Sequence, residues 1–476
     1  MIIDGERVAA IGGGIREIVN PADGTVVTTV PEGDSRDVAK ASAVARKGFE
    51  IWKRLPTAER AKVMHSAAAL VKRDREALAK IITSEMGKPI RQARSEAANV
   101  AELIDYFAEE GLRVSGEIPN LDLSGELPLV LKEPVGVVGT ITPFNYPISL
   151  LSWKLGPALI TGCSVIAKPD EHAPSAALRV AELFVEAGLP KEVFQVVTGD
   201  LRVGNALVDD PGIDKIAFTG GVEAGRSVGA GAMATGKRVT LELGGQCPAL
   251  IDKDADLDVA IAPLVQHTFN NSGQYCYRIN RIYVDAGIHD EFVEQFTRAA
   301  SKLLVRPGIE EDSDIGALCH SGILERSERH IADIEANGGK IVLGGRRLNN
   351  DEYKNGSFMP PTVAVNCKQT MLVMQEETFG PVVGIMAVNS LAEAVELGND
   401  SIYGLAAYVF TGDSGRGLQA ARQLRAGSVW VNGVKKSYPQ LPFGGYKASG
   451  VGREKSHFGL NEYLELKAVY LQLPSI

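Results

Sequence analysis

The chain reads VGVVGTI at residues 135–141, SVIAK at 164–168, FQVVTG at 194–199, DKIAFTG at 214–220 and RVTLEL at 238–243, and this stretch decides the fold. Helical patterns follow the first, second and fourth of these apolar segments. Such alternation predicts parallel strands joined by crossover helices. The result is a doubly wound α/β sheet, which binds ligands at the carboxyl ends of its strands.

The regions on either side extend this organisation. Before the sheet, we expect a hairpin-like stretch near Gly12 and then a packing layer of helices: one capped by Ser35 that runs through Lys53, one from Thr57 to Gly87, and one over 90–108. After Gly244 the α/β alternation restarts, with a helix over 290–304 and strands over 380–386 and 427–432. A second α/β domain is the simplest interpretation.

Two further stretches alternate as exposed strands do. One is EIPNLDLSGELPLVLKEP at 117–134, with a turn near Ser124 and Gly125, and the other is the tail NEYLELKAVYLQLP at 461–474. The tail could pair with the first stretch, including that of another subunit.

The composition limits the function. Among 476 residues, 50 are basic and 59 acidic, a net charge of −9 that argues against a nucleic-acid binder. No apolar run approaches the ~20 residues that span a bilayer, and the opening MIIDGERVAA lacks signal-peptide features, so we expect a cytoplasmic protein without a membrane partner. Five widely spaced cysteines are typical of neither a disulfide scaffold nor a zinc site, so we expect no metal.

Two strand ends could hold a nucleotide. The turn FTGG at 218–221 follows a strand and opens a helix, where glycines and free N–H groups suit a pyrophosphate. Lys168 and Glu171 close another strand and could bind ribose hydroxyls, although a solvated turn explains them equally well. GAGAMA at 229–234 is close to a dinucleotide fingerprint, but it lies inside a helical pattern.

Cys276 is the candidate nucleophile, because SGQYC at 272–276 presents it on a glycine-bearing loop. Glu242, within the apolar LELGG, is a candidate general base; the alternative is a buried ion pair with Arg238 or Lys237. The rigid loop TPFNYP at 142–147 holds Asn145, whose amide could donate to an oxyanion.

In their order along the chain, these segments resemble the NAD(P)-dependent aldehyde dehydrogenase superfamily over nearly the whole sequence. The matching motifs are TPFNYP, GPALITGCSVIAKPDE, FTGG, LELGG, GQYC, EETFGPVV, YGLAAYVF, VWVN and PFGGYKASGVGRE. The 34-residue step from Glu242 to Cys276 also resembles the family's spacing.

The resemblance implies the chemistry. Cys276 attacks the aldehyde, the Asn145 amide and the Cys276 N–H hold the oxyanion, and hydride passes to nicotinamide. Glu242 then activates a water that hydrolyses the thioester to an acid. The implied cofactor-binding residues are Thr142, Pro143, Phe144, Lys168, Glu171, Thr219, Gly220, Gly221, Leu243, Glu377 and Phe379. Most relatives have serine in place of Gly221, so phosphate binding there depends on backbone donors, and Glu171 predicts NAD in preference to NADP.

The substrate is less constrained. The implied pocket comprises Tyr146, Leu150, Trp153, Tyr275, Tyr277 and Phe443. Relatives that oxidise succinic semialdehyde carry arginines in place of Trp153 and Asn270, which disfavours that substrate, while those acting on glyceraldehyde 3-phosphate carry arginine in place of Tyr275. We expect the substrate to be a medium-sized apolar, aromatic or semialdehyde compound. Lys435 and Lys436 could attract an anionic aldehyde, or they could be solvated lysines on a loop.

The resemblance also implies the domain organisation. Residues 1–112 and 135–243 form the cofactor-binding domain, 244–445 the catalytic domain, and 113–134 with 446–476 an oligomerisation ribbon and tail that makes a homodimer or homotetramer. A cysteine hydrolase, a dehydrogenase that transfers the acyl group to coenzyme A, and a non-catalytic scaffold are the alternatives.

Overall fold

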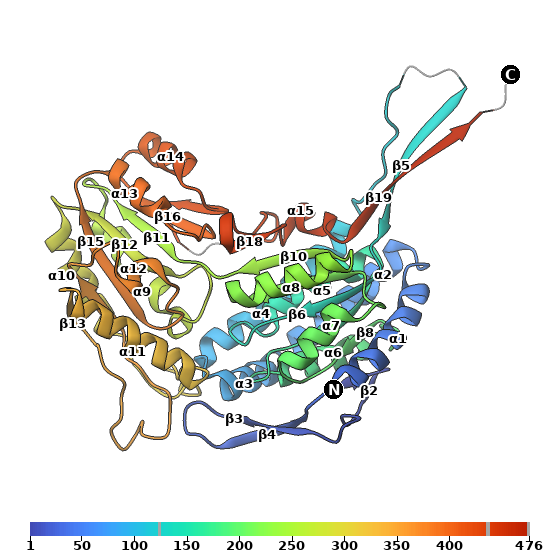
Figure 1. The fold of residues 1–476 in the computed structure, drawn as a ribbon, viewed down its shortest axis with the longest axis horizontal. Coiled ribbons are helices and arrows are strands. Elements are labelled where there is room, and N and C mark those ends of the chain that lie inside the picture. The colour runs from blue at the N-terminus through green and yellow to red at the C-terminus, as the bar shows by residue number, and fades with distance from the viewer. Residues whose placement is uncertain (122–124, 435–437, 474–476) are drawn as a thin grey trace.

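Two α/β sheets lie side by side in the computed structural model, which describes residues 1–121, 125–434 and 438–473 (Figure 1). A two-stranded ribbon projects from the body beside the first sheet (Figure 1). This arrangement confirms the expected class of two doubly wound α/β domains with a small β ribbon. Within the described residues, no helix is both long and apolar enough to cross a bilayer.

The first sheet has the strand order β18-β10-β9-β6-β7-β8-β1-β2. Its five central strands are parallel, namely β10 (Arg238–Leu243), β9 (Lys215–Gly220), β6 (Val137–Ile141), β7 (Ser164–Lys168) and β8 (Phe194–Val196). The antiparallel edges are β1 (Ile2–Ile3), β2 (Glu6–Arg7) and β18 (Gly450–Val451). Its crossover helices are α5 (Ser149–Thr161), α6 (Ser175–Glu186), α7 (Leu201–Asp209) and α8 (Val222–Ala234).

Four helices of the N-terminal region pack against this sheet and its helices: α1 (Ser35–Trp52), α2 (Thr57–Arg73), α3 (Arg75–Met86) and α4 (Ile90–Gly111). Asp34, rather than Ser35, caps α1, because its carboxylate accepts from the Arg36 N–H. The single helix expected over 57–87 is divided at Asp74, whose carboxylate binds Arg179 on α6 at 2.9 Å. Gly87 ends α3 at φ +80°, as expected.

The second sheet has the order β13-β14-β15-β12-β11-β16-β17. Its strands are β11 (Cys247–Ile251), β12 (Ile279–Asp285), β13 (Lys340–Leu343), β14 (Thr362–Val365), β15 (Val382–Val388), β16 (Ala406–Phe410) and β17 (Ser428–Val431), all parallel except β13. The accompanying helices are α9 (Leu257–Phe269), α10 (His289–Ala300), α11 (Ser321–Ala336), α12 (Leu372–Gln375), α13 (Leu391–Asn399) and α14 (Ser414–Gln423). A separate hairpin, β3 (Ile15–Val19) with β4 (Val26–Pro31), precedes α1.

The tail pairs within its own chain. β19 (Leu464–Gln472) runs antiparallel to β5 (Glu126–Pro134) along its whole length. Among the described residues of the 116–133 stretch, the segment before the expected turn forms a single bridge, Glu117 to Val130, and not the strand that was expected there. Ser124 of the expected turn lies outside the described residues. The residues just before the tail form β18 and the short helix α15 (Ser456–Asn461). β18 extends the first sheet at β10.

Candidate active site

The strand ends singled out in the sequence lie at the carboxyl edge of the first sheet. β6 lies between β7 and β9, so the winding direction changes beside β6. The loops that follow strands on either side of such a switch point diverge and leave room for a ligand. Pro143 lies in the loop after β6, Gly220 is the last residue of β9, and Gly221 follows it.

The start of α8 fits an anionic cofactor. Among the described residues, no side chain caps this end, and no atom lies within 4 Å of the position that a Cβ on Gly221 would occupy. The helix therefore offers backbone N–H groups and open space, which suit a pyrophosphate. Nearby, the buried hydroxyl of Thr142 has no hydrogen-bond partner among the described residues. GAGAMA lies inside α8, as its helical pattern indicated.

Three of the remaining cofactor candidates, Lys168, Thr219 and Leu243, lie at the ends of β7, β9 and β10. The Lys168 Nζ lies 3.9 Å from Glu171 Oε2 at the end of β7. Leu243 is buried against α8, so closely that a Cβ on Gly225 would collide with its side chain. The Thr219 hydroxyl accepts a hydrogen bond from Lys154 Nζ at 2.6 Å.

Glu377 contacts the segment that connects β10 of the first sheet to β11 of the second. Its carboxylate accepts from the Gly245 N–H at 3.1 Å, and a Cβ on Gly244 would collide with it. Burial raises the pKa of Glu377 to about 7. Phe379 follows at φ +57° and packs edge-to-face on Phe144, with the ring centroids 5.9 Å apart.

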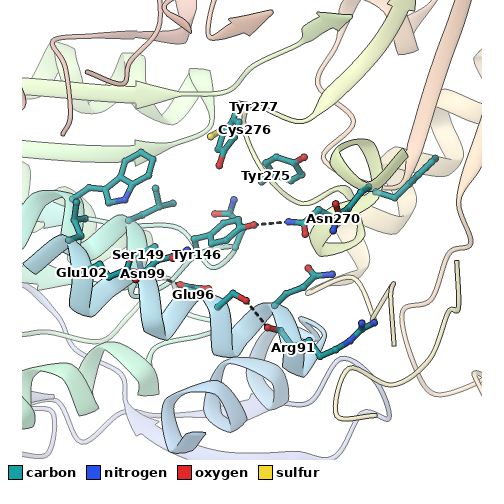
Figure 2. Close-up of a pocket in the computed structure, with 18 of the residues that line it drawn as sticks. Arg91, Glu96, Asn99, Glu102, Tyr146, Ser149, Asn270, Tyr275, Cys276 and Tyr277 are labelled. Carbon is teal, nitrogen blue, oxygen red and sulfur yellow. Dashed lines mark hydrogen bonds between the residues drawn. The ribbon is translucent and has the colours of Figure 1, made fainter. Parts of the chain in front are cut away.

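Cys276 lies on a tightly wound loop after α9. Asn271, Ser272 and Gly273 are all in the left-handed region, with φ of 51°, 57° and 77°. A Cβ on Gly273 would collide with the Gly380 carbonyl, so only glycine fits there. The loop brings Cys276 to the wall of a pocket of about 410 Å³, shown in Figure 2.

Asn145 faces the same pocket and is held by its neighbours. Its Nδ2 donates to the Gln274 carbonyl at 3.0 Å, which fixes the orientation of the amide and leaves the second N–H of that group. Lys88 Nζ and Asn271 Nδ2 both donate to the Asn145 backbone carbonyl, at 2.7 and 3.1 Å. The amide is thus positioned rigidly beside the thiol loop.

Glu242 is a buried carboxyl that forms no ion pair among the described residues, although the charge of nearby Lys154 favours its ionised form. Neither of its oxygens has a hydrogen-bond partner among the described residues. Arg238 pairs instead with Glu465, and Lys237 donates to Thr235 at 3.0 Å, so the ion-pair alternative is wrong. Burial, reinforced by the charge of Glu454, raises the pKa of Glu242 to about 8.

The thiol of Cys276 is also held in its neutral form. Burial and the nearby Glu242 carboxyl raise its pKa well above the usual range. Cys276 is nevertheless 9% exposed, more than any of the four other cysteines, Cys163, Cys247, Cys319 and Cys367. All five are free thiols, and burial raises the pKa of Cys247 to about 12.

Five of the six expected substrate residues line the pocket: Tyr146, Leu150, Trp153, Tyr275 and Tyr277. Phe443 lies behind them, with its ring 5.1 Å from Trp153 and 5.4 Å from Tyr277. The Tyr146 hydroxyl accepts from Asn270 Nδ2 at 3.0 Å, the contact drawn in Figure 2. Lys435 and Lys436 lie outside the described residues.

Sequence reasoning missed two parts of this pocket. Helix α4, expected only to pack, also supplies a polar wall, which comprises Arg91, Gln92, Ser95, Glu96, Asn99 and Glu102 (Figure 2). Lys455 is a further lining residue that is 5% exposed, and its Nζ lies 4.0 Å from the centroid of the Trp153 ring. Burial lowers the pKa of Lys455 to about 8. The polar residues of α4 were visible in the sequence, but nothing near them indicates a pocket. Lys455 follows the PFGGYKASGVGRE motif as a single lysine, and no sequence pattern marks it as a pocket residue.

Comparisons with known proteins agree with this geometry. The sequence matches the aldehyde dehydrogenase family over residues 11–469. The mitochondrial succinate-semialdehyde dehydrogenase of Arabidopsis thaliana is 40% identical over 456 residues, covering 96% of this chain and 86% of that protein. The betaine aldehyde dehydrogenase of Bacillus subtilis is 37% identical over 473 residues, covering 99% of this chain and 96% of that protein.

Solved structures give the same answer. The betaine aldehyde dehydrogenase of Staphylococcus aureus in complex with NAD+ has a TM-score of 0.97 and 36% identity, covering 100% of this chain and 95% of that one. The predicted family and enzyme class are therefore confirmed: the chain belongs to the aldehyde dehydrogenase family.

Proposed function

We propose that the protein oxidises a medium-sized aldehyde to the carboxylic acid with reduction of NAD, by way of a thioester on Cys276. One observation carries the proposal: a thiol and a fixed amide line one pocket, and a buried carboxyl lies close enough to the thiol to raise its pKa. Separately, each has an ordinary structural explanation. Together, they are the nucleophile, the oxyanion donor and the general base that acyl chemistry requires.

Cys276 supplies the nucleophile. Its thiol loses a proton as the sulfur attacks the carbonyl carbon, and the carbonyl oxygen becomes an oxyanion. The second N–H of the Asn145 amide and the Cys276 backbone N–H stabilise that charge. Because Gln274 already fixes the amide, little reorganisation is needed when the charge forms.

NAD, when bound, supplies a hydride acceptor, so that the thiohemiacetal can become a thioester. Its adenosine and pyrophosphate half would be held by Thr142, Pro143, Phe144, Lys168, Glu171, Thr219, Gly220, Gly221 and Leu243, and its nicotinamide ribose by Glu377 and Phe379. We infer a preference for NAD over NADP, because the Glu171 carboxylate binds ribose hydroxyls and repels a 2′-phosphate.

Glu242 completes the cycle as the base. In its ionised form, it takes a proton from a water that attacks the thioester, which releases the acid and regenerates the thiol. The buried carboxyl has no hydrogen-bond partner among the described residues, and burial raises its pKa to about 8. A carboxylate with a pKa near neutrality is a more effective base than a carboxylate with the usual pKa.

An aldehyde panel with NAD or NADP, with and without coenzyme A, tests the proposal. We expect reduced nicotinamide and free acid without coenzyme A. Turnover that requires coenzyme A would favour an acylating dehydrogenase instead. Ester cleavage without cofactor, and no aldehyde oxidation, would favour a cysteine hydrolase.

We further propose the domain roles and assembly. Residues 1–112 and 135–243 bind the cofactor, 244–445 carry the nucleophile, and the β5/β19 ribbon joins subunits into a dimer or tetramer. The ribbon supports this role because Leu466 and Tyr470 of β19 are 69% and 78% exposed, and apolar side chains on an open strand edge favour association.

A further inference from the structure

Arg278 is a fully buried arginine two residues after Cys276. Its guanidinium donates through Nη1 to the Gly380 carbonyl and through Nη2 to the Val382 carbonyl, and its Nε donates to Asn280 Oδ1 at 2.5 Å. A guanidinium is a rigid planar fork. By binding two carbonyls of one stretch, it fixes that stretch relative to the loop that carries the arginine.

The stretch held in this way ends the 376–381 segment, which connects α12 to β15. This segment carries Glu377 and Phe379, the two residues proposed to hold the nicotinamide ribose. Gly380 follows Phe379 directly, and the two carbonyls that Arg278 binds lie on either side of Pro381. Phe379 has a φ of 57°, a conformation that persists only where the surrounding structure holds it. Arg278 supplies part of that support.

Asn280 extends the connection to a third segment. Its Nδ2 donates to the Gly245 carbonyl at 3.0 Å, and the Gly245 N–H in turn donates to the Glu377 carboxylate at 3.1 Å. Gly245 follows β10, the strand that carries Glu242. Arg278 and Asn280 therefore connect the surroundings of the proposed nucleophile, ribose ligand and base.

The 376–381 segment also lies directly against the thiol loop, residues 271–276. A Cβ on Gly273 would collide with the Gly380 carbonyl and with Arg278 Nη1, and a Cβ on Gly380 would collide with Ser327 Oγ of α11. Contacts packed this closely transmit a displacement of one segment to its neighbours. One set of contacts, with Arg278 at its centre, thus positions both loops.

The charge of Arg278 acts on the same segment. Burial lowers the pKa of Arg278 to about 10, so the guanidinium is charged at neutral pH. Burial raises the pKa of Glu377 to about 7, whereas the Gly245 N–H and the charges of Arg326 and Arg278 act in the opposite direction. Arg278 therefore favours the ionised carboxylate, which is the better acceptor for ribose hydroxyls.

We propose that Arg278 is a positioning residue for hydride transfer, an inference that rests on the aldehyde oxidation proposed above. In that step, the C–H bond of the thiohemiacetal breaks, the hydrogen passes with both electrons to the nicotinamide ring, and the carbonyl of the thioester forms. Arg278 acts through Glu377 and Phe379, and fixes where they hold the ring relative to the Cys276 sulfur. A displacement of about 1 Å at such a site is sufficient to slow a reaction about 100-fold.

Stopped-flow measurement of the first turnover tests this role. The variants are made in the Glu242→Gln background, where we expect the thioester to persist, so the amplitude of the burst of reduced nicotinamide counts the competent chains. The rate constant of the burst measures hydride transfer, and deuterium on the aldehyde carbon should lower it. Arg278→Met removes the donors and should lower the rate constant about 10- to 100-fold at unchanged amplitude. Arg278→Lys, which keeps the charge without the fork, should give an intermediate value.

Calorimetry without aldehyde provides a second measurement. ADP carries the adenosine and pyrophosphate of NAD but no nicotinamide ribose. Arg278→Met should therefore raise the Kd of NAD about threefold or more, through weaker ribose contacts, and leave the Kd of ADP unchanged.

Two further variants complete the test. Asn280→Ala removes one acceptor of the guanidinium and should lower the burst rate constant about threefold or more, which keeps the inference testable if Arg278→Met folds poorly. Arg298→Met, at an exposed arginine of α10, is the control and should keep the rate constant and both Kd values.

The outcomes separate the two proposals. A lower amplitude with an unchanged rate constant in Arg278→Met would show that Arg278 only supports folding, and would overturn the inference. Equal weakening of NAD and ADP binding would also overturn it. Either result leaves the proposed function standing, whereas both proposals would fail if chains with Arg278 intact reduced neither NAD nor NADP with any aldehyde.

Discussion

Replacing Glu242 by glutamine removes the proposed base, because an amide cannot ionise, while the side chain keeps nearly the same size and shape. The pKa of about 8 means that Glu242 is protonated below that pH and ionised above it. From pH 7 to pH 9, the ionised fraction rises from about one tenth to about nine tenths, so we expect thioester hydrolysis to accelerate about tenfold with increasing pH. Glutamine cannot ionise, so the variant should lose this dependence.

The same change should spare the first half of the reaction. The Glu242 carboxyl raises the pKa of the Cys276 thiol, so its removal does not weaken the nucleophile. We expect an initial burst of reduced nicotinamide in Glu242→Gln, followed by a steady state lower by about 100-fold or more.

Stopped-flow absorbance between pH 6.5 and 9.5 measures both phases. Glu109→Gln, at an exposed position of α4, is the control and should behave as the wild type. A wild-type hydrolysis rate that does not change with pH, or a variant with an undiminished steady state, would refute the assignment of Glu242 as the base.

Three further predictions concern the other candidate residues. Asn145→Ala should lower kcat/KM for an aldehyde about 100- to 1000-fold through loss of an oxyanion donor, and a loss below threefold would contradict that role. Glu171→Gln should raise kcat/KM with NADP relative to NAD; an unchanged ratio would show that Glu171 does not discriminate between them. Tyr470→Asp should shift the assembly to smaller species in light scattering after size exclusion, and an unchanged mass would argue against ribbon-mediated association.

Local patterns predicted the parts of the fold that depend on local physics. Apolar runs flanked by glycine located the strands of the first sheet, because a strand buried on both faces must be apolar throughout. Gly87 ended its helix as expected. The division at Asp74 was missed: the Asp74 carboxylate binds Arg179, 105 residues further along the chain, and such a contact leaves no pattern in the neighbouring residues.

Long-range pairing explains the other differences. The alternating tail predicted a strand that could pair with the 116–133 stretch, and only the folded chain shows that this partner, β5, belongs to the same subunit. The periodicity of α4 marked its buried face without indicating that a pocket lies beside its polar residues. Lys455 was missed because neither its positive φ nor its contact with Trp153, some 300 residues earlier, leaves a signal in the adjacent residues.

The acyl-enzyme on Cys276 can be measured directly. The Glu242→Gln variant is incubated with an aldehyde and NAD, and the masses of the intact protein and of its proteolytic peptides are measured by mass spectrometry. We predict a gain equal to the mass of the aldehyde less two hydrogens, carried by the peptide that contains Cys276, with one reduced cofactor formed for each modified chain. Reduced cofactor without a mass gain, or the same gain on another residue, would contradict the thioester mechanism.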